Sequence, residues 1–172
     1  MLQYKFKIVV GGDASVGKTS LIRHYCEGYF KDAYLSTIGV SFLKKEIQLE
    51  DKNIILQIWD VGGQQIFQSV RPNYYKGAHG ALILFDVSNL STLVHTTDWY
   101  QEIRTARKNI PIYLVGNKID LDYDKEDIES RAENLVGRMP MKLSWTSART
   151  GERMNTVFEE IALDMIKEVP QK

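Results

Sequence analysis

The sequence predicts an α/β fold in which helices cover both faces of a largely parallel sheet. Apolar runs of strand length alternate with helical patterns along the 172 residues. Parallel neighbours need a long crossover, and a helix supplies it, so this alternation favours parallel strand pairs. The expected strands are residues 4–10, 41–50, 53–59, 81–87, 111–116 and 141–145.

One connection is too short to hold a helix. Only a few residues, around Asp51 and Lys52, separate the strand expected at 41–50 from the strand expected at 53–59. These two strands should therefore form an antiparallel hairpin at the edge of the sheet. The expected helices lie near residues 18–28, 65–76, 91–108, 125–138 and 152–168.

The composition favours one domain spanning residues 1–172 and a cytoplasmic protein. Lys plus Arg and Asp plus Glu both number 22, so there is no electrostatic argument for nucleic acid or an anionic membrane as the main partner. The single cysteine, Cys26, cannot form an intramolecular disulfide, which is typical of a reducing compartment. We find no leader, membrane span or lipidation motif, so we expect no intrinsic membrane anchor in this chain, and we expect a monomer.

A glycine-rich segment follows the first expected strand and leads into the first expected helix. Residues 12–19 have the sequence GDASVGKT, which matches the pattern G-x-x-x-x-G-K-[ST] of a phosphate-binding loop, or P-loop. In such a loop, backbone N–H groups and the helix N-terminus face the phosphate oxygens. Lys18 is expected to reach the β- and γ-phosphates, and Thr19 to bind Mg²⁺. The predicted phosphate-binding residues are Asp13, Ala14, Ser15, Val16, Gly17, Lys18, Thr19 and Ser20.

A second motif, NKID at residues 117–120, follows another expected strand and points to guanine. The Asp120 carboxylate can accept hydrogen bonds from N1–H and the 2-amino group of guanine. Adenine lacks both donors, so it would leave this carboxylate unpaired. The stem of Lys118 can cover the ring face, and backbone N–H groups at residues 146–148 can bond the base oxygen. The predicted base-binding residues are Asn117, Lys118, Asp120, Ser147 and Ala148.

With these motifs in order along essentially its whole length, the chain resembles the Ras superfamily of small GTPases, and most closely the Rab branch. Further similarity lies at residues 34–42 (YLSTIGVSF), 59–64 (WDVGGQ) and 74–78 (YYKGA). The resemblance implies a P-loop NTPase small G domain, with a six-stranded, mostly parallel sheet, one antiparallel edge strand and five helices. It also implies a switch that binds GTP or GDP with Mg²⁺ and hydrolyses GTP slowly to GDP.

The resemblance assigns the metal and catalytic residues. It implies that Thr37, in the loop called switch I, is the second hydroxyl on Mg²⁺ beside Thr19, and that Asp60 holds the metal through water. The order of Thr37 would depend on the γ-phosphate. Lys18 and Thr37 are then catalytic together with Gln64, which orients the attacking water.

Other contacts with the nucleotide follow from the same resemblance. The N–H of Gly63 is implied to touch the γ-phosphate, and Phe30 to lie edgewise against guanine. Tyr34 would close over the phosphates. Arg149 takes the place of the lysine in the family's Ser-Ala-Lys motif beside the base.

The resemblance also implies protein partners. Phe42, Trp59 and Tyr74 match the aromatic triad that Rab proteins present to effectors between the two switches. No candidate for an internal arginine finger is obvious, so an activating protein is expected to supply one, and an exchange factor to act on GDP. Rab proteins continue into a tail with prenylated cysteines that this chain lacks. A role in membrane trafficking with peripheral membrane association is therefore an expectation that the chain itself does not encode.

Two alternatives to a hydrolysing switch remain open. Ala14 stands where many family members have glycine, and its methyl group can crowd the site where Gln64 meets the γ-phosphate. That crowding would leave a GTP-binding scaffold with negligible hydrolysis. A P-loop kinase would need an acceptor pocket with a lid, but the interval between Lys18 and Asp60 is taken up by switch I and the hairpin. Gln64 and Thr37 favour the hydrolase over both.

Overall fold

The computed structural model describes residues 2–32 and 36–170. Its six strands form one sheet in the order β2-β3-β1-β4-β5-β6. β2 pairs antiparallel with β3, and the other four pairings are parallel, so the predicted α/β sheet with an antiparallel edge strand is confirmed. The strands are β1 (Leu2–Gly11), β2 (Val40–Leu49), β3 (Lys52–Val61), β4 (Gly80–Asp86), β5 (Ile112–Asn117) and β6 (Lys142–Thr146).

Each of the five expected helical regions contains helix, but two of them are interrupted. The region expected at 65–76 is a 3-10 turn followed by a short helix that has Pro72 in its first turn, where its missing N–H costs nothing. The region expected at 91–108 is divided at His95. The helices are α1 (Lys18–Glu27), η1 (Gln65–Phe67), α2 (Arg71–Tyr75), α3 (Leu90–Val94), α4 (Thr96–Ala106), α5 (Lys125–Val136) and α6 (Met154–Lys167).

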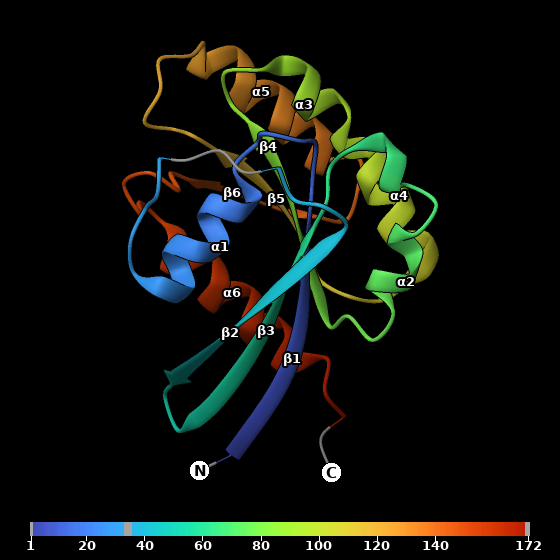
Figure 1. The fold of residues 1–172 in the computed structure, drawn as a ribbon, viewed down its shortest axis with the longest axis vertical. Coiled ribbons are helices and arrows are strands. Elements are labelled where there is room, and N and C mark those ends of the chain that lie inside the picture. Colours follow the sequence, from blue (N-terminus) through green and yellow to red (C-terminus); the bar gives the residue numbers. More distant parts are fainter. Residues whose placement is uncertain (1, 33–35, 171–172) are drawn as a thin grey trace.

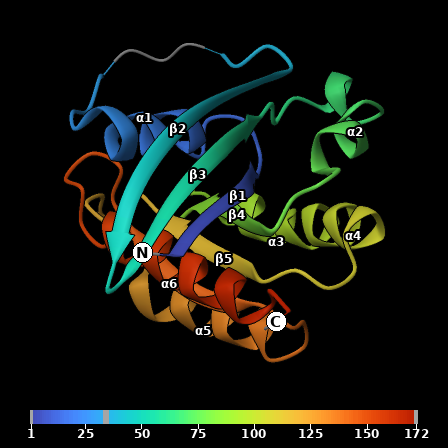
Figure 2. The same ribbon diagram turned by 90° about the horizontal axis from the view of Figure 1, so that it is seen from below.

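Two apolar clusters fill the space on either face of the sheet. Successive side chains of β1 point to opposite faces, so Ile8 and Val10 join the cluster under α1 and α6, whereas Val9 joins the cluster under α2, α4 and α5. Figure 1 shows α1 and α6 on one side of the strands and α2 and α4 on the other, and Figure 2 shows the same layers from below. This double coverage explains why β4 and β5 are buried along their whole length.

The parallel strands bring the predicted motifs to one edge of the sheet. β1, β3 and β5 end at Gly11, Val61 and Asn117, and the segments that follow them contain the P-loop, Gln64 and the NKID motif. Ligands bind at the carboxyl ends of strands in such sheets. Within residues 2–32 and 36–170, no helix combines the length and the apolar character needed to cross a bilayer.

Candidate functional site

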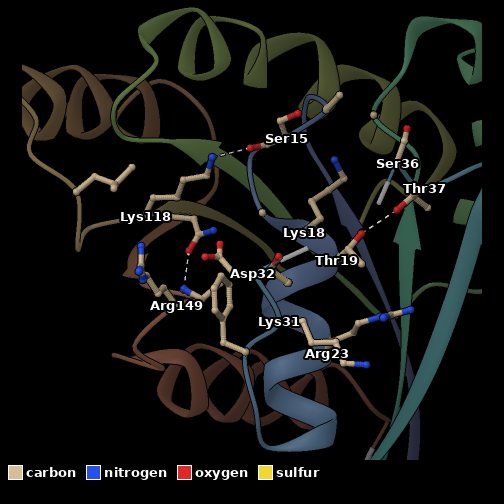
Figure 3. A pocket seen from close by; sticks show the side chains of 18 of the residues that line it. Ser15, Lys18, Thr19, Arg23, Lys31, Asp32, Ser36, Thr37, Lys118 and Arg149 are labelled. Atoms are coloured by element: carbon tan, nitrogen blue, oxygen red, sulfur yellow. Dashed lines mark hydrogen bonds between the residues drawn. The ribbon is translucent and has the colours of Figure 1, made fainter. Parts of the chain in front are cut away.

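A cavity of about 540 Å³ lies at the carboxyl edge of the sheet, between α1 and the loops that precede β2 and follow β3, β5 and β6. Figure 3 shows the side chains that line it. It brings together most of the residues that the sequence predicted: Ala14, Ser15, Gly17, Lys18, Thr19, Ser20, Phe30, Thr37, Gly63, Gln64, Asn117, Lys118, Asp120, Ala148 and Arg149. The volume falls within the range usual for small-molecule sites.

Four predicted residues do not line this cavity. The Asp13 side chain turns toward α4, Val16 is buried in the core, and Ser147 lies behind Asp120. Asp60 sits below the floor and reaches the cavity through Thr19. Tyr34 falls outside the residues that the structure describes.

Lys18 lies at the centre of the P-loop and is only 6% exposed. Its Nζ donates hydrogen bonds to the carbonyl oxygens of Gly12 at 2.6 Å and Asp13 at 2.8 Å. Burial lowers the pKa of this amine to about 8, although the carboxylates of Asp60 and Asp13 oppose the shift. A buried cation whose partners are neutral carbonyls has no counter-charge, and such a charge is costly. An anion such as phosphate would supply the missing counter-charge, so the cavity floor favours anion binding.

Three oxygen-bearing side chains meet next to Lys18. Thr19 Oγ1 and Thr37 Oγ1 lie 2.8 Å apart, and both hydroxyls donate to Asp60 Oδ2, Thr37 at 3.2 Å. Asp60 is 2% exposed, and its second oxygen, Oδ1, is buried with no hydrogen-bond partner among the described residues. A buried carboxylate oxygen without a partner is costly. The Asp60 carboxylate and the two hydroxyls that meet at its Oδ2 form a hard-oxygen set of the kind Mg²⁺ prefers.

Gly63 brings the end of β3 against the P-loop. A Cβ at this residue would come within 2.5 Å of the Ala14 nitrogen and 2.6 Å of the Gly12 oxygen, so no side chain fits. The next residue, Gln64, lines the cavity and donates its amide to Ser36 Oγ at 2.6 Å. Ser36 is a contact that the sequence motifs did not indicate.

Asn117 connects the P-loop to the loop after β6. Its Nδ2 donates to the Val16 carbonyl at 2.9 Å, and its Oδ1 accepts from Thr146 Oγ1 at 3.1 Å and from the Ala148 N–H at 3.0 Å. The side chain is fully buried. Asn117 thus holds the P-loop and the loop after β6 together, and the Ala148 N–H that was expected to face the base oxygen is engaged by Asn117 in this structure.

Asp120 and Lys118, which the sequence predicted to contact the base, both line the cavity. Asp120 Oδ1 accepts from Ser147 Oγ at 2.5 Å, an arrangement that holds the carboxylate in one orientation. Lys118 lies across the cavity wall with its Nζ donating to the Ser15 carbonyl at 2.7 Å (Figure 3). The same Nζ pairs with Asp86 Oδ2 at 2.7 Å. Burial raises the pKa of Asp86, but hydrogen bonds from Lys118 and Ser88 outweigh it and leave that pKa lowered. The sequence motifs indicated neither Asp86 nor Ser88.

The predicted aromatic triad is partly exposed. Phe42 is 51% exposed and stacks on Trp59 with ring centroids 5.3 Å apart, and Lys7 Nζ lies 3.7 Å from the Trp59 ring centroid. Tyr74 is half-buried. Ile38 and Ile66, which the sequence did not single out, are 84% and 77% exposed. The segment that precedes β2 and the segment that follows β3, both next to the cavity, therefore have exposed apolar side chains.

Comparison with known proteins identifies the family. The model of the Ras family matches residues 7–167. The chain is 35% identical over 159 residues to Ras-related protein Rab-3 of Caenorhabditis elegans, an alignment that covers 92% of this chain and 73% of that relative. It is 36% identical over 170 residues to Ras-related protein Rab-1 of Theileria annulata and of Theileria parva, covering 98% of this chain and 77% of each relative. The chain therefore belongs to the Ras family and is a Rab-like small GTPase.

Proposed function

We propose that this protein is a molecular switch that binds GTP or GDP together with Mg²⁺ in the 540 Å³ cavity and slowly hydrolyses GTP to GDP. The observation that carries the proposal is the meeting of Thr19, Thr37 and Asp60 beside the buried Lys18. Thr37 belongs to switch I, the segment 28–39 between α1 and β2, whereas Thr19 and Lys18 belong to the P-loop and α1. A ligand held by both would couple the loop to the nucleotide.

In the proposed complex, the base lies against Asp120 and the phosphates lie over the P-loop. Asp120 accepts from N1–H and the 2-amino group of guanine, and Ser147 keeps the carboxylate oriented. Lys18 exchanges its carbonyl partners for the β- and γ-phosphate oxygens. Phe30 and the stem of Lys118 enclose the base, and Arg149 lies at its edge.

Hydrolysis requires a water aligned with the γ-phosphate. Thr19 and Thr37, with Asp60 behind them, would hold Mg²⁺, which would neutralise charge on the β- and γ-phosphates. Gly63 places its N–H at the γ-phosphate because the absence of a side chain lets it contact the P-loop. Gln64 releases Ser36 and turns its amide toward the water. Water adds to the γ-phosphorus, the bond to the bridging oxygen breaks, and GDP and phosphate leave.

Loss of the Thr37 hydroxyl should weaken the GTP complex selectively. We expect Thr37→Ala to raise the Mg²⁺ concentration needed to slow dissociation of a fluorescent, non-hydrolysable GTP analogue by about tenfold. Dissociation of GDP should change little, because Thr37 is proposed to engage the metal only when the γ-phosphate is present. Thr37→Ser, which keeps the hydroxyl, is the control and should match the wild type. Equal Mg²⁺ dependence in all three proteins would contradict the assignment of Thr37 to the metal.

Gln64 should be required for hydrolysis and not for binding. In single-turnover measurements we expect Gln64→Leu to slow conversion of GTP to GDP by about tenfold or more, because the attacking water loses its orienting amide. Gln68→Leu removes an exposed amide from the same segment and should leave the rate unchanged. A Gln64→Leu protein as fast as the wild type would exclude this role.

The alternative function is a GTP-binding scaffold with negligible hydrolysis. Two observations favour it: the methyl group of Ala14 lines the cavity, and the Gln64 amide is engaged by Ser36. Single-turnover rates of the wild type and Ala14→Gly separate the two functions. A wild type with no measurable hydrolysis and an active Ala14→Gly variant would support the scaffold, whereas equal measurable rates would exclude crowding by Ala14.

Partner proteins are part of the proposal. Ile38 lies in switch I, Phe42 lies on β2 and Ile66 lies in η1 just after Gln64; all three are exposed and offer an apolar surface to effectors. Arg71 is held by Glu102 and so is not an internal arginine finger, which supports an activating protein that supplies an arginine. An exchange factor would release GDP. The likeness to Rab proteins supports a role in membrane trafficking with peripheral membrane association, in a cytoplasmic protein.

A further inference from the structure

We propose that Asp13, Trp99, Arg71 and Glu102 form a positioning bridge, which ties the backbone of Gln64 to the P-loop through α4. The inference rests on the proposed hydrolysis and adds Trp99, Arg71 and Glu102 to it, which no sequence motif indicates. Trp99 and Glu102 lie on α4, Asp13 lies in the P-loop, and Arg71 begins α2. None of the four lines the nucleotide cavity, so each would act through another residue.

The first end of the bridge holds the P-loop. The Asp13 carboxylate points away from the cavity, where Oδ1 accepts the Trp99 Nε1–H at 3.0 Å and Oδ2 lies 2.5 Å from His95 Nδ1. The carbonyl oxygen of the same Asp13 accepts from Lys18 Nζ at 2.8 Å. Asp13 therefore connects α4 with the backbone of the P-loop, and this connection stays when Lys18 exchanges the Asp13 carbonyl for phosphate oxygens as proposed.

Trp99 is the fixed centre of the bridge. It is 4% exposed, and its ring covers Gly11 so closely that a Cβ there would come within 2.9 Å of it. The indole N–H donates to Asp13, and the Arg71 guanidinium lies over the ring, with its carbon 4.1 Å from the ring centroid. At this distance a cation is attracted to the face of an aromatic ring, and this cation–π interaction adds to the packing of Arg71 against Trp99.

The second end of the bridge holds the segment that contains Gln64. Arg71 is 5% exposed and donates from Nε and Nη2 to the two carboxylate oxygens of Glu102 at 2.7 and 2.8 Å. Tyr75 Oη donates to the same carboxylate at 2.6 Å. With two nitrogens fixed by Glu102, the third, Nη1, donates to the backbone carbonyl of Gln64 at 3.3 Å. The bidentate pair thus determines where the Gln64 backbone can lie.

Only a guanidinium can make this set of contacts at once. A lysine at residue 71 would bring one ammonium in place of three nitrogens in a rigid plane, so it cannot face Trp99, pair with both Glu102 oxygens and reach the Gln64 carbonyl. The Gln64 side chain can still rotate, but its backbone would no longer be held relative to the γ-phosphate site. Small displacements of an orienting group are costly for hydrolysis and matter little for affinity.

The test combines Arg71→Lys with Gln64→Leu and measures two rates. We expect Arg71→Lys to slow single-turnover GTP hydrolysis by about tenfold, with dissociation of a fluorescent GTP analogue changed by less than about twofold. In the Gln64→Leu background, Arg71→Lys should have no further effect on hydrolysis. The backbone of residue 64 is still present there, but the side-chain amide that it positions is missing. Arg104→Lys is the matched control: Arg104 lies on α4 and, like Arg71, donates to a backbone carbonyl and faces an aromatic ring, that of Tyr100, 5.4 Å away.

The outcomes separate the bridge from the proposed function. Failure of the wild type to hydrolyse GTP would remove the function itself. Slow hydrolysis in Gln64→Leu with a normal rate in Arg71→Lys, or an equal loss from Arg71→Lys in both backgrounds, would leave the function intact and overturn the bridge. If Arg71→Lys does not fold, Glu102→Gln keeps the volume, weakens the grip on Arg71 and should show the same dependence on Gln64.

Discussion

Replacing Asp120 by asparagine is expected to weaken GTP binding by about 10³-fold or more. A hydrogen-bonding site discriminates strongly when its donors and acceptors no longer match those of the ligand, and this substitution creates such a mismatch with guanine. The Asp120 carboxylate accepts from Ser147 with one oxygen and is proposed to accept from two donors of guanine. An amide in its place offers one acceptor and one donor, and the donor would face the 2-amino group of the base. The result is two donors in contact and a lost charge-assisted hydrogen bond.

The same substitution should create binding of xanthine nucleotides. Xanthine has a carbonyl in place of the 2-amino group and keeps N1–H, so an asparagine amide can donate to the first and accept from the second. Competition of GTP, XTP and ATP for a fluorescent nucleotide measures the change. Asp122→Asn, two residues along the same exposed segment, is the control and should bind GTP as the wild type does. Undiminished GTP affinity in Asp120→Asn would contradict the base assignment.

Replacing Lys18 by methionine is expected to lower nucleotide affinity by at least about 100-fold, which corresponds to the loss of two hydrogen bonds from a charged donor. Methionine keeps most of the buried volume but cannot pair with phosphate oxygens. Equilibrium titration with fluorescent GDP in the presence of Mg²⁺ measures the loss. Lys125→Met, at an exposed lysine of α5, should have no effect.

The Lys18 variant also separates binding from folding. Burial disfavours the charge of Lys18 and lowers its pKa to about 8, so near pH 7 the folded protein holds this cation at a cost. Without nucleotide, Lys18→Met is therefore expected to unfold in urea at a concentration no lower than the wild type does. At a GDP concentration that saturates the wild type, Lys18→Met should gain less stability than the wild type, because the stabilisation by a ligand falls as its affinity falls. An equal gain in both proteins would show that Lys18 does not bind the phosphates.

The sequence predicted the sheet and most of the cavity because both depend on local patterns. Each of these patterns is contained in a few consecutive residues: the apolar runs of strand length, the short link at residues 50–53, and the two motifs at strand ends. Chain topology then brings the motifs together, since parallel strands end at one edge. The interruption of two expected helices depends on local geometry around Pro72 and His95 that periodicity alone does not reveal.

The missed features join residues far apart in the sequence. Arg71 and Glu102 are 31 residues apart, and neither belongs to a motif, so nothing in the sequence indicates that they pair. The Asn117 amide spans 101 residues to reach Val16. Its motif marked Asn117 as a candidate site residue, but only the structure reveals that its partners are the P-loop and the loop after β6. Contacts of this kind follow from packing, which sequence patterns do not encode.

The most direct test of the central claim is to identify the nucleotide released from the purified protein and then to follow its conversion with Mg²⁺ present and absent. The account predicts that GDP or GTP is released, and that added GTP becomes GDP and phosphate slowly, only with Mg²⁺, and more slowly still in Gln64→Leu. Release of ATP or ADP, or GTP conversion that is independent of both Mg²⁺ and Gln64, would contradict it.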